Sequence, residues 1–227
     1  MGRPMPRNSE PLVLVWDLPT RLFHWCLVLL VLAAWISADQ GWMTLHLPCG
    51  LSLLALLLFR IAWGLVGSST ARFRNFLHSP RRVLDYLRGD GRIYAGHNPA
   101  GGLMVAVMIA VLLAQALSGL FANDGVHFHG PLALTVPSEL SDRITGIHGL
   151  IFNMILALVW IHVAAVGFYL LVRRHNLVLP MFTGRKPRRQ VPDGVELVFT
   201  RLSLALLLFF VSAAIAAWIM IQGGSLP

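Results

Sequence analysis

The stretch 141-SDRITGIHGLIFNMILALVWIHVAAVGFYLLVRRHN-176 decides the fold, because it is apolar enough to cross a membrane and still holds two histidines. A helix needs roughly 20 residues to cross a hydrocarbon core. His148 and His162 are fourteen residues apart, which corresponds to a rise of about 21 Å and ends about 40° short of whole turns. The two imidazoles therefore share one helix face and lie near opposite membrane surfaces.

Other parts of the chain are equally apolar. Of its 227 residues 56% are hydrophobic and 12% charged, and the mean hydropathy is +0.70. A membrane span must satisfy its backbone hydrogen bonds internally, so we expect an all-α membrane protein, a four-helix transmembrane bundle with a fifth, C-terminal transmembrane helix. The expected helices are Pro19–Ser37, His46–Val66, Gly101–Phe121, Ile147–Val172 and Leu197–Ile221.

The apolar segments divide the chain into four parts: an N-terminal cytoplasmic segment, a four-helix core, a basic cytoplasmic loop and the fifth helix. Their bounds are 1–18, 19–172, 173–196 and 197–221. Glu10, Asp17 and several prolines precede the first helix, which makes a poor signal-peptide n-region. We expect that helix to be retained. Cys26 and Cys49 fall at ends predicted to lie on opposite sides of the membrane, so no disulfide is expected.

The formal charge of +8 resembles that of a nucleic-acid-binding protein, but the basic residues are segregated. They cluster in three segments, with Arg3, Arg7 and Arg21; Arg72, Arg74, Arg81, Arg82, Arg88 and Arg92; and Arg173, Arg174, Arg185, Lys186, Arg188 and Arg189. The other connections hold only Arg143. The positive-inside rule places the N-terminus in the cytoplasm of a bacterial inner membrane and the C-terminus outside. Contact with anionic membrane lipid explains the charge, and no nucleic-acid partner is expected.

Four histidines lie within or at the ends of these helices, where ionisable residues are costly and mark function by default. With the N-terminus inside, His24 lies near the inner surface and His46 near the outer surface. His148 is outer and His162 inner. The depths therefore predict two pairs, His24 with His162 and His46 with His148.

Two imidazoles suit haem iron better than zinc. Zinc takes four ligands, or three and water, whereas a porphyrin fills four positions and two histidines complete an electron-transfer site. We interpret His24, His46, His148 and His162 as axial ligands of two b haems. The alternative is packing histidines that hydrogen-bond between helices. The chain has no c-type haem attachment motif and no nucleotide-binding glycine motif.

Further polar residues are weaker candidates. Arg60 lies fourteen residues after His46, on the same face at the inner depth, where it could pair with a haem propionate or extend to the interface. His97, in YAGHNPAGG, could line a quinone or propionate site. Asp17 and Arg21 are further candidates for a quinone site on the inner side.

The loop 123–145 contains the HxH pair His127 and His129. A metal could bind there, although nearby loop histidines are more often solvated. Ser118 and Gly119 are small enough to permit close helix packing, as are several glycines around the fourth expected helix.

Several motifs together resemble the prokaryotic cytochrome b561 family: VWDLPTRLFHW, LLLFRIAWG, YAGHNPAGGLMV, SGLFANDG and IHGLIFNMILALVWIHVAAVGFYLLVRRHNLVLPMFTGRK. The likeness covers about Val15 to Lys186. It implies a four-helix bundle with two b haems ligated from helices one, two and four. That pattern carries onto His24, His46, His148 and His162. The fifth helix departs from the family's core.

The resemblance implies electron transfer between a redox partner and the quinone pool. The partner could be a hydrogenase or dehydrogenase subunit or a c-type cytochrome, and whether the protein is an enzyme or an electron-transfer subunit stays open. One alternative is a superoxide:quinone oxidoreductase, for which Arg143 is the outer cation available. Another is a haem-free membrane anchor. A homodimer and a role for the fifth helix in holding a partner are further alternatives.

Overall fold

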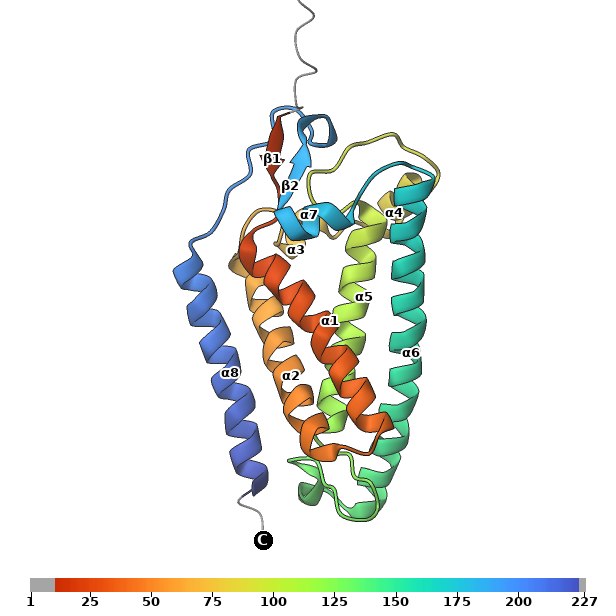
Figure 1. Cartoon of the computed structure of the whole chain (residues 1–227), viewed down its shortest axis with the longest axis vertical. Coiled ribbons are helices and arrows are strands. Elements are labelled where there is room, and N and C mark those ends of the chain that lie inside the picture. The colour runs from red at the N-terminus through yellow and green to blue at the C-terminus, as the bar shows by residue number, and fades with distance from the viewer. Residues whose placement is uncertain (1–10, 225–227) are drawn as a thin grey trace, which may run out of the picture.

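The computed structural model describes residues 11–224, so Arg3 and Arg7 of the first basic segment lie outside it. Five long helices form an elongated bundle (Figure 1), and each of them is long and apolar enough to cross a membrane. This confirms the predicted all-α membrane fold. The helices are α1 (Leu18–Asp39), α2 (Met43–Val66), α5 (Pro99–Gly119), α6 (Ser138–Leu171) and α8 (Leu202–Gly224).

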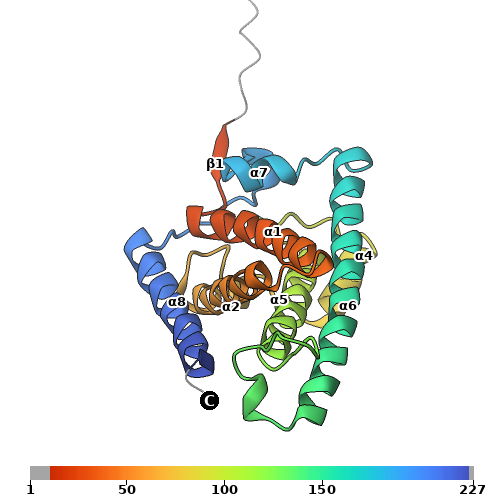
Figure 2. The ribbon, with the colours of Figure 1, turned by 60° about the horizontal axis from the view of Figure 1, so that its bottom comes forward.

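Helix α2 is the centre of the bundle. It packs against α1, α5 and α8, while α5 packs in turn against α6 (Figure 2). Most of the apolar span of α2 is buried (61%), compared with 6% for α6. Leu57 of α2 forms a buried cluster with Ile109 of α5 and Ile155 of α6. The outer helices therefore leave most of their apolar surface to lipid, and α2 supplies the common core.

Local sequence explains where two of the helices begin. The Asp17 carboxylate accepts a hydrogen bond from the Thr20 N–H at 2.8 Å, and the Asn98 side-chain oxygen accepts one from the Gly101 N–H at 2.7 Å. Such N-caps satisfy backbone donors that have no partner within the helix. A proline early in the first turn of each helix is also favourable there.

Two helices begin five or more residues away from their predicted starts. Helix α6 begins nine residues before the expected start at Ile147, so much of the long loop predicted at 123–145 is helical. The polar residues of its first turns hide this extension from a hydropathy pattern. They bind the preceding loop, because the Asn123 amide donates to the Ser141 hydroxyl at 2.7 Å and the Asn123 N–H to Thr145 at 3.0 Å.

Helix α8 begins at Leu202, five residues after the expected Leu197. The chain just before it is held outside the helix by two serines that follow α2. The Val198 N–H donates to the Ser69 hydroxyl at 3.0 Å, and the Thr200 N–H donates to the Ser68 hydroxyl at 3.1 Å. These side-chain acceptors compete with helical hydrogen bonding and fix the start of α8 beside the end of α2.

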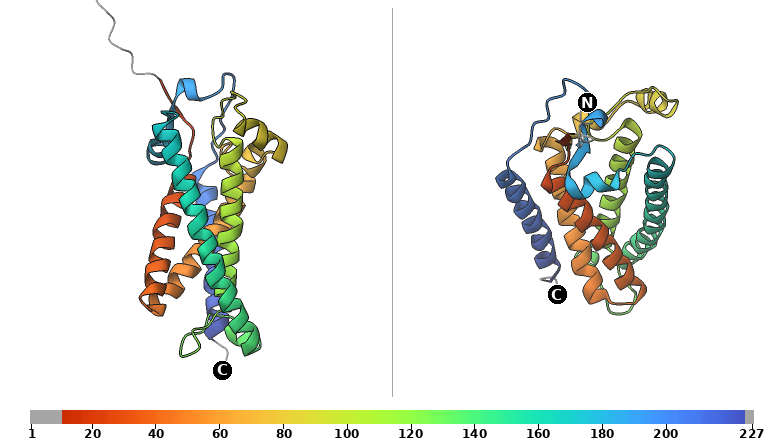
Figure 3. Two further views of the ribbon diagram at one scale, coloured as in Figure 1. Left: turned by 90° about the vertical axis from the view of Figure 1, so that its right-hand side faces the viewer. Right: turned by 45° about the horizontal axis from the view of Figure 1, so that its top comes forward.

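Residues 11–17 of the expected N-terminal segment and the basic loop fold together at one end of the bundle, which we call the cap (Figure 3). Strand β1 (Leu12–Leu14) pairs antiparallel with β2 (Arg185–Pro187), with Val13 opposite Lys186. Helix α7 (Val178–Thr183) lies between α6 and β2. The shorter helices α3 (Phe73–Phe76) and α4 (Pro80–Leu87) follow α2. The cap thus covers the bundle end at which α1 and α5 begin.

Lys186 is buried in the cap, with 7% of its surface exposed. Its ammonium donates to the carbonyls of Ala95 at 2.9 Å and Gly96 at 3.3 Å, and it lies 5.8 Å from the centre of the Trp16 ring. Burial lowers the pKa of Lys186 from 10.5 to about 8. This lysine therefore joins β2, the N-terminal segment and the 95–97 loop at the cost of a partly desolvated charge.

This burial predicts a pH dependence of stability. Between pH 8 and 10.5 the unfolded chain binds more protons at Lys186 than the folded chain does, so stability rises with pH in that window. The gain is at most about 3.5 kcal/mol, because the folded and unfolded pKa values differ by about 2.5 and a difference of one corresponds to about 1.4 kcal/mol. We expect the melting temperature of the detergent-solubilised haem-loaded protein to rise relative to that of Lys186→Met between pH 7.5 and 10. Parallel curves for the two proteins would contradict this.

Candidate functional site

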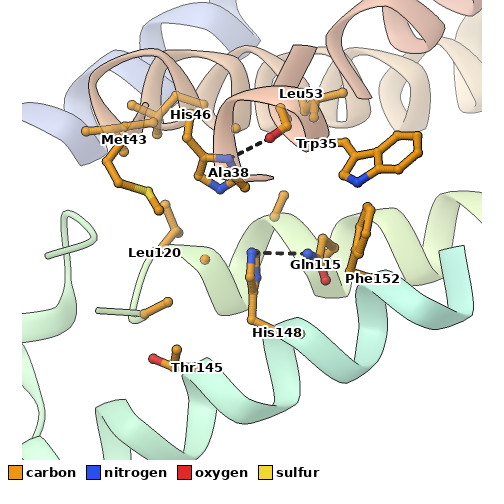
Figure 4. A pocket seen from close by; sticks show the side chains of 18 of the residues that line it. Trp35, Ala38, Met43, His46, Leu53, Gln115, Leu120, Thr145, His148 and Phe152 are labelled. Carbon is orange, nitrogen blue, oxygen red and sulfur yellow. Dashed lines mark hydrogen bonds between the residues drawn. The ribbon is translucent and has the colours of Figure 1, made fainter. Parts of the chain in front are cut away.

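A cavity of about 300 Å³ lies between α1, α2, α5 and α6 at the bundle end opposite the cap (Figure 4). This volume is within the range of small-molecule and cofactor sites. Its walls are mainly apolar, with Trp35, Leu47, Leu112 and Phe152 among them. His46 and His148 are the two imidazoles that line it. The cavity therefore has the character of a site for a large apolar ligand that imidazole can hold.

His46 of α2 and His148 of α6 approach each other across this cavity. Their ring centroids are 6.3 Å apart and the ring planes cross at 84°. The Nδ1 atom of His46 lies 2.9 Å from the Ala34 carbonyl of α1. Because a carbonyl can only accept, His46 donates from Nδ1, and its Nε2 keeps an unprotonated lone pair.

The ring of His148 is held by α5. The Ser118 hydroxyl donates its single proton to the Gln115 carbonyl at 3.0 Å. The same oxygen lies 3.0 Å from His148 Nδ1, so it accepts the Nδ1 proton. The Gln115 side-chain nitrogen donates to His148 Nε2 at 3.1 Å, as Figure 4 shows. His148 therefore has the same tautomer as His46, with the Nε2 lone pair available.

Glycines provide room for a flat ligand in the same cavity. Gly50 of α2 and Gly149 of α6 both line it, and a Cβ built on either would meet no atom within 4 Å. Gly119 of α5 differs, because a Cβ there would lie 3.0 Å from His148 Cε1. A flat macrocycle whose metal takes imidazole nitrogen would fit this set of donors and open surfaces. His46 and His148 would hold it.

A second group of polar residues lies at the cap end. His24 of α1 and His162 of α6 interact electrostatically. The Nδ1 atom of His24 is buried and has no hydrogen-bond partner among the described residues. Both rings are half-buried. The structure thus brings His46 and His148 together across the cavity, whereas for His24 and His162 it shows an electrostatic interaction. The buried, unpartnered nitrogen of His24 is compatible with ligation.

His97 precedes α5 and packs against this inner group. Its ring centroid lies 4.6 Å from that of Trp16 and 4.7 Å from that of Phe76. Burial, then the positive charges of Arg60 and Lys186, lower the pKa of His97 to about 3, so the ring is neutral at physiological pH. Its Nδ1 is buried without a hydrogen-bond partner in residues 11–224.

Arg60 is buried in α2, with 2% of its surface exposed, so it does not extend to a surface of the chain. One guanidinium nitrogen donates to the Ala71 carbonyl at 3.2 Å. The guanidinium carbon lies 5.1–5.9 Å from the centres of three aromatic rings, those of Phe23, Phe73 and Phe76. Among the described residues no carboxylate lies within ion-pair distance of Arg60.

The other predicted polar residues have structural partners. Asp17 caps α1 and also accepts a hydrogen bond from the Trp63 indole at 3.0 Å, and Arg21 donates to the Phe182 carbonyl of α7. Of the three residues considered for a quinone site, His97 at Nδ1 and Arg21 at Nε each keep a buried nitrogen without a hydrogen-bond partner among the described residues. Arg143 is exposed and does not line the cavity, where the charged lining residue is Asp124.

The loop histidines and the cysteines do not form sites. His127 and His129 are both exposed, and within residues 11–224 no group of three metal-binding side chains occurs. Cys26 and Cys49 are both free. Sequence reasoning missed the contacts of Ser118 and Gln115 with His148. Ser118 stood out only as a small residue.

The fold and the cavity define a class of protein, a helical membrane protein with room for a large apolar ligand between its long helices. A comparison with known protein families matches residues 15–184 to the family described as prokaryotic cytochrome b561. This is well over half of the 227 residues, so the chain belongs to that family. No curated protein matches the chain. The protein is therefore a b-type cytochrome of a bacterial membrane that takes part in electron transfer, and its family favours haem binding over the haem-free alternative.

Proposed function

We propose that the protein binds two b haems and transfers electrons across the membrane between a redox partner and the quinone pool. His46 and His148 ligate the outer haem, and His24 and His162 ligate the inner haem. Each pair joins α6 to α1 or α2, so α6 serves both sites. The haems, when bound, supply the one-electron chemistry, and the chain sets their positions and potentials.

The arrangement of His46 and His148 carries this proposal. Both Nδ1 atoms donate to oxygen atoms of neighbouring helices, and each ring keeps an Nε2 lone pair for a metal. A hydrogen bond from the ring nitrogen that does not bind the metal fixes the tautomer and orientation of a ligating histidine. Packing histidines would need no shared tautomer and no cavity between their rings.

The neutral ring of His97 supports a quinone site beside the inner haem. Its unpartnered Nδ1 could bond a quinone oxygen or a quinol hydroxyl, depending on its tautomer. Because its low pKa keeps His97 neutral, the ring would contact the quinone through a hydrogen bond and not as a fixed positive charge. In this proposal Asp17 and Arg21 do not contact the quinone, and they stabilise the positions of α1 and α7.

The distribution of charge supports the proposed orientation. Among residues 11–224, Arg143 is the one Lys or Arg near the cavity end of the bundle. The connections at the cap end carry most of the others. By the positive-inside rule the cap faces the cytoplasm, and the His46–His148 cavity faces outward. A redox partner would then exchange electrons with the outer haem.

The fifth helix fits a role in contact with lipid or a partner. Helix α8 packs against α2 and contributes no residue to the cavity wall. Phe210 and Trp218 are exposed on it. We propose that it shields α2 from lipid and offers its outer face to a partner subunit or to a second copy of the chain.

Spectroscopy of the purified protein tests the proposal. We expect a b-type α band in the reduced-minus-oxidised spectrum and a pyridine haemochrome ratio of two haems per chain. In liposomes, a short-chain quinol should reduce both haems, and His97→Phe should slow this without loss of haem. One haem per chain would contradict the paired sites. Unchanged quinol reduction by His97→Phe would remove the quinone site from His97.

A further inference from the structure

Helix α5 supplies no candidate ligand, yet its residues contact both nitrogen atoms of the His148 ring. Ser118 bonds Nδ1 at 3.0 Å, Gln115 bonds Nε2 at 3.1 Å, and Gly119 lies against Cε1. Residues 115, 118 and 119 share one face of a helix. The orientation of His148 thus depends on a helix that the ligand pattern does not include.

The direction of the Ser118 hydrogen bonds follows from counting protons. A serine hydroxyl has one proton and two lone pairs. The proton goes to the Gln115 carbonyl at 3.0 Å, so the contact with His148 must use a lone pair of Ser118 and the Nδ1 proton. Gln115 faces Nε2, and its own Oε1 is buried without a partner among the described residues. When haem iron occupies the Nε2 position, the Gln115 amide must move, whereas the Ser118 bond can persist.

We propose that Ser118 is a positioning residue of the outer haem site, which keeps the Nε2 atom of His148 directed into the cavity and lowers the reduction potential of the haem bound there. The inference rests on the proposed function, because it requires His148 to be a ligand. A hydrogen bond from Nδ1 raises the basicity of a ligating imidazole, and a more basic ligand favours ferric over ferrous iron. Hydrogen bonding to the axial ligands is one of the protein's means of setting a haem potential.

The two outer ligands differ in how they can be tested. His46 donates to the backbone carbonyl of Ala34, which no side-chain substitution removes. His148 donates to a side chain, so the bond can be removed by changing one hydroxyl group. Threonine and valine have nearly the same shape and differ in that hydroxyl. They form a matched pair at position 118.

The experiment is a redox titration of the haem-loaded protein followed at the α band. We expect Ser118→Val to raise the potential of one haem, so that its ratio of reduced to oxidised form at a fixed ambient potential rises about tenfold. That change corresponds to about 59 mV for one electron. Ser118→Thr should stay near the wild type, and the other haem should keep its potential in both variants. The ferric EPR signal of the same haem should change in Ser118→Val alone.

A buried serine far from the cavity serves as the control. Ser212 of α8 is 4% exposed, and its hydroxyl bonds the Leu208 carbonyl at 2.8 Å. Ser212→Ala should leave both potentials unchanged. Equal potentials in Ser118→Val and Ser118→Thr, with both haems bound, would overturn the inference and leave the proposed function intact. Loss of the outer haem in Ser118→Val but not in Ser118→Thr would support the positioning role. A wild-type protein without an outer haem would overturn both proposals.

Discussion

His46→Ala and His148→Ala should each remove the same haem and leave the other in place. Their rings face each other across one cavity, with centroids 6.3 Å apart, so either change leaves one imidazole for the iron of the outer haem. We expect the haemochrome ratio of each variant to fall from two to about one. The double variant should resemble the single variants, because the ligands act as a unit.

The inner pair provides the complementary result. His24→Ala and His162→Ala should both remove the haem that His46→Ala and His148→Ala retain. Redox titration identifies which haem remains, because the two sites differ in their surroundings. His175→Ala is the control, since that histidine is exposed and follows α6. It should keep both haems and both potentials.

Rescue by imidazole added to the medium is a second test of ligation, because it restores a lost ligand in place of removing one. Alanine at position 148 leaves space beside Ser118 and Gly119, and free imidazole can occupy it. We expect imidazole to restore the low-spin spectrum and the haem content of His148→Ala. Any other grouping of the four variants, such as joint loss in His24→Ala and His46→Ala, would refute the proposed pairing.

The approach of His46 to His148 could be predicted because it follows from helix geometry, and the same geometry underlies the proposed pairing of His24 with His162. The rise per residue is fixed, so the positions of His24, His46, His148 and His162 in apolar segments determine their depths. The alternation of helix direction across the membrane then matches the depths in pairs. None of this requires knowledge of how the helices pack.

The contribution of α5 and the structure of the cap could not be predicted in this way. The Ser118–His148 contact joins two helices whose packing no periodic pattern specifies, and α5 carries no histidine. Strands β1 and β2 have three residues each and are separated by most of the chain. The polar first turns of α6 lack the hydropathy on which its predicted start depended. In each case the deciding contact is between residues far apart in sequence.

Arg60→Met should lower the reduction potential of the inner haem while the outer haem keeps its own. Arg60 is 2% exposed and interacts electrostatically with His97, which in turn interacts with His24 and His162. A nearby buried cation disfavours the positive charge of ferric haem and so favours reduction. Removing it should lower the ratio of reduced to oxidised inner haem about tenfold at a fixed ambient potential, which corresponds to roughly 1.4 kcal/mol.

The same substitution should leave stability nearly unchanged or increase it. The guanidinium is buried without a carboxylate within ion-pair distance in the described part of the chain, and desolvating a charge is costly. The hydrogen bond to Ala71 and the three aromatic rings offset part of that cost. Methionine retains most of the apolar stem. We expect the melting temperature of the haem-loaded Arg60→Met protein to be no lower than that of the wild type.

The combination of the two results distinguishes a functional charge from a packing residue. Arg60→Lys retains the charge but not the planar fork, so it should keep most of the inner potential and bind the inner haem less tightly if a propionate is the partner. Arg143→Met, at the other end of the bundle, is the control and should leave the inner potential unchanged. A large loss of stability in Arg60→Met with no change in potential would mean that Arg60 supports packing alone. A lower potential at unchanged stability would mean that Arg60 does not stabilise the fold and that its buried charge sets the reduction potential of the inner haem.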